Sequence, residues 1–109
     1  MKNFQLIKIV IQFQLLLLFL LPIKGFGRII HVPGDYLKIQ NALNVASEGD
    51  TVQVAPGRYF ENIKWPETND IKLIGGGEDC TIIDGGSMGH VIEISFMYGT
   101  AVIQGFKII

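Results

Sequence analysis

The stretch that decides the fold is GDTVQVAPGRYFENI, residues 49–63. Its two valines, Val52 and Val54, alternate with polar residues, which is the period of a β-strand with one buried face. The Pro-Gly pair that follows predicts a tight corner, because proline presets one backbone dihedral and glycine accepts one that other residues avoid. An aromatic and β-branched run then begins again at Tyr59. The stretch therefore predicts a strand, a corner and a second strand.

The chain downstream repeats this pattern of a short apolar run followed by a glycine corner. The runs read V-x-V, I-x-L, V-I-x-I, A-V-I and F-x-I, and Val52 stands 20 residues before Lys72, near the length of one solenoid turn. A solenoid stacks its turns so that apolar side chains fill the interior and each turn contacts its neighbours. We expect strands at Arg28–Val32, Thr51–Ala55, Tyr59–Trp65, Ile71–Gly75, Cys80–Asp84, His90–Ser95 and Thr100–Ile109.

One short helix is expected before these strands, at Tyr36–Ala46. Apolar residues fall at helical spacing on one face, and Asp35 stands where its carboxylate would cap the first turn. Gly49 is the expected stop signal after the helix. The open end of a solenoid exposes backbone groups and apolar side chains, so we expect this helix to cover it.

The amino terminus has the pattern of a secretory signal peptide over residues 1–27. Lysines at positions 2 and 8 precede a run without charge, residues 9–23, and a proline then interrupts it. The alternative is a retained membrane anchor, but the run has 15 residues, short of the ~20 that cross a bilayer. We therefore expect a secreted or cell-surface protein with one domain at residues 28–109, and contact with the membrane only through the export signal.

Composition narrows the class of partner and of site. The formal net charge is −1 and no basic stripe is present, so no nucleic-acid partner is expected. The single cysteine, Cys80, excludes an internal disulfide and a multi-cysteine metal site. We expect Cys80 to be buried beside the strand TIID, because free cysteines usually are. Thirteen glycines favour an all-β chain with many corners.

Four segments together resemble a known family. They are Ile39-Gln40-x-Ala42-Leu43, GDTVQVAPGRYFENI, IKLIGGG and TIIDG. The chain over residues 29–109 resembles the amino-terminal part of right-handed parallel β-helix proteins of the pectin-lyase-like superfamily. The resemblance implies an all-β fold, the start of a right-handed parallel β-helix with one short capping α-helix.

The resemblance extends to one signature block of an enzyme. Gly57-x-Tyr59-x-Glu61 matches the first block of pectinesterases, G-x-Y-x-E. The working aspartates, glutamines and arginine of pectinesterases, and the calcium-binding and catalytic residues of polysaccharide lyases, lie on later coils of those proteins. The resemblance therefore implies no catalytic residue, no metal and no cofactor in this chain.

The candidate substrate-binding residues are Tyr59, Glu61 and Trp65. Tyr59 and Glu61 share one strand face, so an aromatic ring beside a carboxylate could form a sugar platform; the alternative is that Tyr59 packs inside while Glu61 binds a backbone amide. Trp65 is either a core residue at a corner or an exposed ring that stacks on sugar.

Three further groups are expected to be structural. The triple glycine at residues 75–77 lacks phosphate-loop spacing and predicts a corner. The carboxylates of Glu78, Asp79 and Asp84 match no calcium-binding pattern and are expected to be solvated. The two histidines, His31 and His90, lie in different strands without an interpretable triad partner.

The sequence thus favours an exported β-helix segment that is non-catalytic on its own and associated with carbohydrate or the cell surface, with polysaccharide as its partner. The alternative is the amino-terminal fragment of a pectinesterase-like or polysaccharide-lyase-like enzyme. The last run is apolar to Ile109 without a polar cap, so we also expect a fragment or self-association through this uncapped rung.

Overall fold

The computed structural model describes residues 27–95 and 99–109. Residues 1–26 of the expected signal peptide lie outside the described residues. The elements are β1 (Ile29–Val32), α2 (Ile39–Val45), β2 (Thr51–Val54), β3 (Gly57–Phe60), β4 (Ile63–Lys64), β5 (Ile71–Ile74), β6 (Thr81–Asp84), β7 (Ile92–Glu93), β8 (Ala101–Gln104) and β9 (Lys107–Ile108). The described part contains no helix long and apolar enough to cross a membrane.

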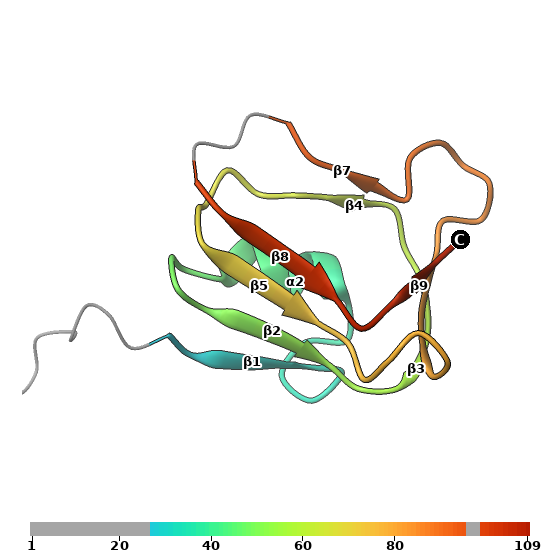
Figure 1. The fold of residues 1–109 in the computed structure, drawn as a ribbon, viewed down its shortest axis with the longest axis horizontal. Coiled ribbons are helices and arrows are strands. Elements are labelled where there is room, and N and C mark those ends of the chain that lie inside the picture. The colour runs from blue at the N-terminus through green and yellow to red at the C-terminus, as the bar shows by residue number, and fades with distance from the viewer. Residues whose placement is uncertain (1–26, 96–98) are drawn as a thin grey trace, which may run out of the picture.

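The strands form three sheets in which every pairing is parallel. Sheet A has the order β1-β2-β5-β8, sheet B has β3-β6-β9, and sheet C has β4-β7. Figure 1 shows the four strands of sheet A side by side in that order. From β2 onward the chain passes through sheets A, B and C, repeats that order with β5, β6 and β7, and enters A and B again with β8 and β9.

Register aligns like side chains in rows across the sheets. In sheet A, Ile30 pairs with Val52, Val52 with Leu73, and Leu73 with Ile103. The first three of these are buried and Ile103 is partly buried, so this row points into the interior. The predicted alternation of the first strand is confirmed, because Val52 and Val54 are buried.

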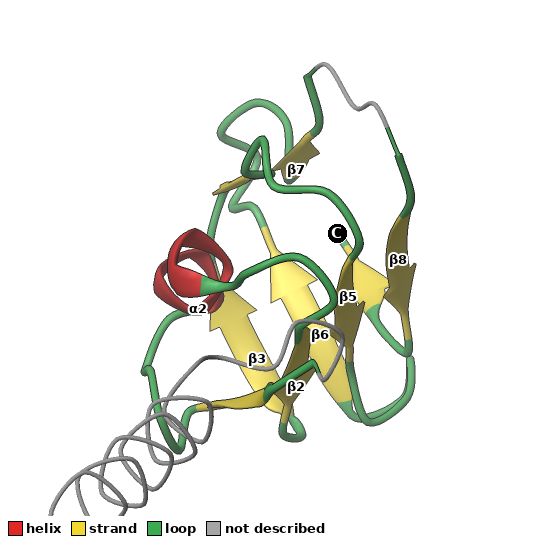
Figure 2. Ribbon diagram, turned by 90° about the vertical axis from the view of Figure 1, so that its left-hand side faces the viewer, coloured by secondary structure: helices red, strands yellow, loops and turns green. Residues whose placement is uncertain are grey.

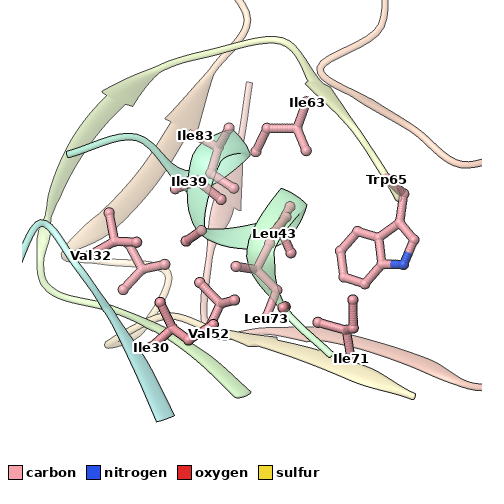
Figure 3. Packing of buried hydrophobic residues seen from close by; sticks show 13 residues of the cluster. Ile30, Val32, Ile39, Leu43, Val52, Ile63, Trp65, Ile71, Leu73 and Ile83 are labelled. Carbon is pink, nitrogen blue, oxygen red and sulfur yellow. The ribbon is translucent and has the colours of Figure 1, made fainter. Parts of the chain in front are cut away.

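Helix α2 packs against β1, β2 and β4. Its apolar face carries Ile39, Ala42 and Leu43, which are fully buried. Figure 3 shows Ile39 and Leu43 pointing from the helix toward aliphatic side chains of the strands. Figure 2 shows the helix at one side of the strands, on the left of the view. The predicted buried face of the helix is therefore confirmed.

The expected start of the helix and its cap were wrong. The helix begins at Ile39, and Lys38 at the N-cap position makes no side-chain hydrogen bond to it. Asp35 instead closes a turn after β1: its Oδ2 accepts the His31 N–H at 2.8 Å, and its own N–H donates to the His31 carbonyl at 2.8 Å. A short acidic side chain readily serves such a local turn, which competes with capping.

Two expected strands are each divided by a corner. The run Tyr59–Trp65 separates into β3 and β4, and the run Thr100–Ile109 into β8 and β9. Gly105 forms the second corner with φ +81, and a Cβ there would lie 2.4 Å from the carbonyl oxygen of Gly75. Only glycine fits where two corners stack this closely, because any side chain would overlap the backbone.

Candidate functional site

Tyr59 lies in β3 and faces the interior. Its ring is partly buried against the core, and its Oη donates a hydrogen bond to the Ala55 carbonyl at 2.8 Å. Burial raises the pKa of the Tyr59 phenol, and the nearby Glu61 carboxylate raises it further. The ring therefore fills the first pass of the chain and ties its hydroxyl to the preceding corner, as the packing interpretation predicted.

Glu61 follows β3 and caps helix α2. Its Oε2 accepts the Ile39 N–H at 2.9 Å and its Oε1 accepts the Gln40 N–H at 3.0 Å. These amides belong to the first turn of the helix, where no intrahelical acceptor exists. A carboxylate there also interacts favourably with the helix dipole. Of the two interpretations of Glu61, the structure supports the one in which it binds backbone amides.

Trp65 is buried, with 3% of its surface exposed. It lies just after β4, and Figure 3 shows its ring beside Ile71 at one side of the core. Among the described residues its indole N–H has no hydrogen-bond partner. A ring in this position offers no open face to a sugar, so Trp65 is not part of the predicted sugar-binding surface. Its size favours burial at a corner over exposure.

The three predicted residues therefore do not form one exposed surface. Tyr59 and Glu61 meet at the corner between β3 and β4, but both are engaged with the body of the protein. Trp65 lies inside. Glu61 joins the corner after β3 to the start of helix α2, and none of the three contributes an exposed, unengaged binding group.

Gln40 is a residue that the sequence did not single out for a role. Its Oε1 accepts the Lys64 N–H at 2.7 Å and its Nε2 donates to the Lys64 carbonyl at 2.9 Å. The side-chain amide thus pairs with the backbone of β4 as a neighbouring strand would. It satisfies polar groups at the strand edge that sheet C leaves on this side.

Asn62 is a second residue of this kind. Its Nδ2 lies 3.2 Å from the Gly85 carbonyl oxygen, 3.5 Å from that of Met88 and 3.1 Å from that of His90. One corner amide thus holds the loop between β6 and β7 in the next pass. Asparagine is a residue type common in corners, so the sequence is consistent with this position. The hydrogen-bond partners, however, are more than twenty positions away, so no nearby sequence pattern predicts them.

Asp50 joins the start of β1 to the loop after α2. Its carboxylate accepts the N–H groups of Arg28 and Ser47, each at 2.8 Å, and binds the Arg28 guanidinium, with Nη2 at 3.2 Å. Burial raises the pKa of Asp50, but the hydrogen bonds from Ser47 and Arg28 and the charge of Arg28 outweigh it. The pKa therefore lies below its ordinary value.

The outer face of sheet B carries an exposed cluster. Phe60 is 71% exposed, and the Arg58 guanidinium carbon lies over its ring, 5.3 Å from the centroid. Both N–H groups Nε and Nη2 of Arg58 bind Asp84 Oδ2, with Nε at 3.0 Å. The hydrogen bond from Arg58 and that from the Gly86 N–H lower the pKa of Asp84. The alternation of the sequence predicts Phe60 on the strand face opposite Tyr59, and its exposure confirms this.

Cys80 is exposed, so the expectation of burial was wrong. It lies in the corner before β6, and the next residue takes the interior position. Thr81 is fully buried, and its Oγ1 accepts the Gly76 N–H at 2.9 Å. A hydroxyl that receives a backbone donor can be buried without an unpaired polar group.

Within residues 27–95 and 99–109, no three metal-ligating side chains converge. An open hollow of about 360 Å³ lies between the start of α2 and the corner after β3, lined by Lys38, Gln40, Asn41, Phe60, Glu61 and Asn62.

Comparison with known proteins adds no assignment: no family model, no curated protein and no solved structure matches the chain.

Proposed function

We propose that residues 28–109 are the amino-terminal cap and first coils of a right-handed parallel β-helix. In this proposal the protein is exported, is non-catalytic as this chain stands, and associates with carbohydrate or the cell surface by presenting flat sheet faces. The proposed fold is that of the pectin-lyase-like superfamily, which the sequence resembles.

The order of the strands supports the solenoid. The chain enters sheets A, B and C in the same sequence on successive passes, and each strand pairs in parallel with its equivalent in the next pass. Connections between parallel strands of one sheet are right-handed in nearly all proteins, which supports the hand of the coil. Helix α2 covers one end of the stack, as a cap would.

The engagement of Tyr59 and Glu61 carries the proposal that this segment is non-catalytic. The Glu61 carboxylate receives two backbone N–H groups, and the Tyr59 hydroxyl donates to a carbonyl. A general acid or base must reach the proton that it transfers, and Glu61 is already occupied by the helix. The signature block is therefore explained by closure of the first coil.

The outer faces of the sheets support association with an uncharged polymer. On sheet A the register gives the outward row His31, Gln53, Ile74 and Gln104. A second row contains Ile29, Thr51, Lys72 and Val102. Strands lie ~4.8 Å apart, so these rows offer amide, hydroxyl and aliphatic groups, with one imidazole and one ammonium, at regular intervals to a ligand with repeating hydroxyls.

The test uses the full chain expressed with its own amino terminus. Amino-terminal sequencing of the exported form checks cleavage of the signal. Co-sedimentation with insoluble cellulose, chitin and xylan checks binding, and pectin depolymerisation and hydrolysis of p-nitrophenyl acetate check catalysis. We expect export, retention on at least one polysaccharide and no turnover. Turnover above a no-protein control would favour the enzyme alternative, and retention on none of the polymers would reject carbohydrate association.

A further inference from the structure

The exposed Phe60 ring lies against Arg58, which is anchored by Asp84. The Arg58 guanidinium lies over its ring, and Asp84 fixes that guanidinium through two N–H groups. Asp84 is itself oriented by the Gly86 N–H, which donates to its Oδ1 at 2.8 Å. A ring that is already ordered loses little conformational freedom when a ligand stacks on it. With 71% of the residue exposed, a large part of the ring remains open to a ligand.

The hollow beside Phe60 adds polar groups to this ring. Lys38 and Asn41 come from the start of α2 and line the hollow together with Phe60. Among the described residues, the Asn41 amide and the Lys38 ammonium take part in no hydrogen bond or ion pair, whereas Gln40 and Glu61 are bound to backbone groups. Glu61 accepts the Ile39 and Gln40 amides of the helix, and the Asn41 and Lys38 side chains supply the free polar groups.

The charges around this site balance. Lys38 and Arg58 carry positive charge, and Glu61 and Asp84 carry negative charge. A polyanion such as a nucleic acid requires a positive groove, and none is built here. An aromatic face next to an amide suits an uncharged ring that has one apolar face and a rim of hydroxyls, because C–H groups approach the negative π face while hydroxyls bind the amide.

We propose that Phe60, with Asn41 and Lys38 at its side, binds a pyranose unit of a neutral glycan. The proposal rests on the carbohydrate association proposed above and adds one defined site to it, on the outer face of sheet B beside α2. Arg58 and Asp84 act as positioning residues that hold the ring. Because no net charge drives the contact, binding is expected to vary little with salt.

The test measures binding of cellohexaose, xylohexaose and mannohexaose to the full chain by isothermal titration calorimetry, at low and high sodium chloride. We expect at least one neutral hexasaccharide to bind with little dependence on salt. Phe60→Leu keeps an apolar side chain but removes the π face, so it should weaken binding about tenfold. Phe60→Tyr keeps an aromatic face and should bind as the parent does. Phe60 is exposed, so both variants should melt within a few degrees of the parent.

Matched variants on sheet A separate the two proposals. Ile29 is also a large exposed apolar residue, at 60%, but it lies on the outer face of sheet A. Met88→Ala, at a loop position outside both surfaces that is 77% exposed, is the control that should leave binding unchanged, and Ile29→Ala and Gln53→Ala probe the outer rows of sheet A. Loss of binding in the two sheet A variants with none in Phe60→Leu would overturn the Phe60 site while carbohydrate association stands. Binding of hexagalacturonate or single-stranded oligonucleotide in preference to neutral sugars would also overturn it, and failure to bind any polysaccharide would reject both proposals.

Discussion

The two ends of the strand stack differ in how far their apolar side chains are covered. On the side of α2, the helix buries Leu43 completely against the strands, and the Gln40 amide pairs with both backbone groups of Lys64. On the side of β8 and β9, Ile103 is only partly buried and Ile108 is 47% exposed. Within the described residues, no strand pairs with the outer edge of β8.

In the β-helix that we propose, the difference indicates what a capping helix has to provide. Ile103 continues the same inward row as the buried Val52 and Leu73, so its greater exposure comes from its position in the stack. A cap must therefore cover apolar side chains and also satisfy strand-edge polar groups. Helix α2 does the first with its apolar face and the second with one side-chain amide. The expected self-association through the uncapped rung stays a prediction, which light scattering of the full chain tests.

The largest expected effect compares Leu43→Ala with Ile103→Ala. Leu43 lies on the apolar face of α2 and is fully buried, so its truncation should lower the free energy of unfolding by about 2–5 kcal/mol. Ile103 has less area to lose, and its truncation should cost about half as much or less. Urea unfolding followed by circular dichroism measures both. Equal losses would show that the two ends are equally well packed, against the comparison.

Asp50→Asn probes the junction on the capped side. Asp50 is buried and binds Arg28 and Ser47. Replacing its carboxylate by a neutral amide should therefore lower the free energy of unfolding by about 1–3 kcal/mol at neutral pH. Its folded pKa is lowered, so its contribution is complete above the ordinary aspartate pKa of about 4 and is lost as the pH falls through the folded value.

Stability profiles across pH test this assignment. The parent should lose more stability than the Asp50→Asn variant on acidification below pH about 4. Asp79→Asn, at an exposed corner position, is the control and should leave the profile unchanged. Parallel profiles for the parent and Asp50→Asn would show that Asp50 does not stabilise the folded state through its charge.

Glu61→Gln is expected to give the smallest effect. The amide retains one acceptor for the helix N–H groups but loses the charge, so about 1 kcal/mol should be lost. Hydrogen exchange of the Ile39 and Gln40 amides should become faster, because they lose a charged acceptor. Glu48→Gln, at an exposed position after the helix, should change neither quantity. Unchanged exchange in Glu61→Gln would exclude a capping role.

The candidate site was predictable only where neighbours in the sequence decide it. The alternation in β3 places Tyr59 and Phe60 on opposite faces, and the structure confirms this. The role of Glu61 depends on amides 22 positions earlier, and the pairing of Arg58 with Asp84 spans 26 positions. These partners lie in different passes of the chain, so no local pattern in the sequence encodes which side chains meet.

The sequence alone determined the period-two strands, the apolar face of the helix and the sites of many corners, because these follow from local backbone preference and from which side chains avoid water. The tertiary structure decided which polar groups meet. It assigned Glu61 to the helix, Gln40 to the edge of β4 and Trp65 to the interior, and it left Cys80 outside. Each of these outcomes depends on a partner that only the stacking of successive passes brings within reach.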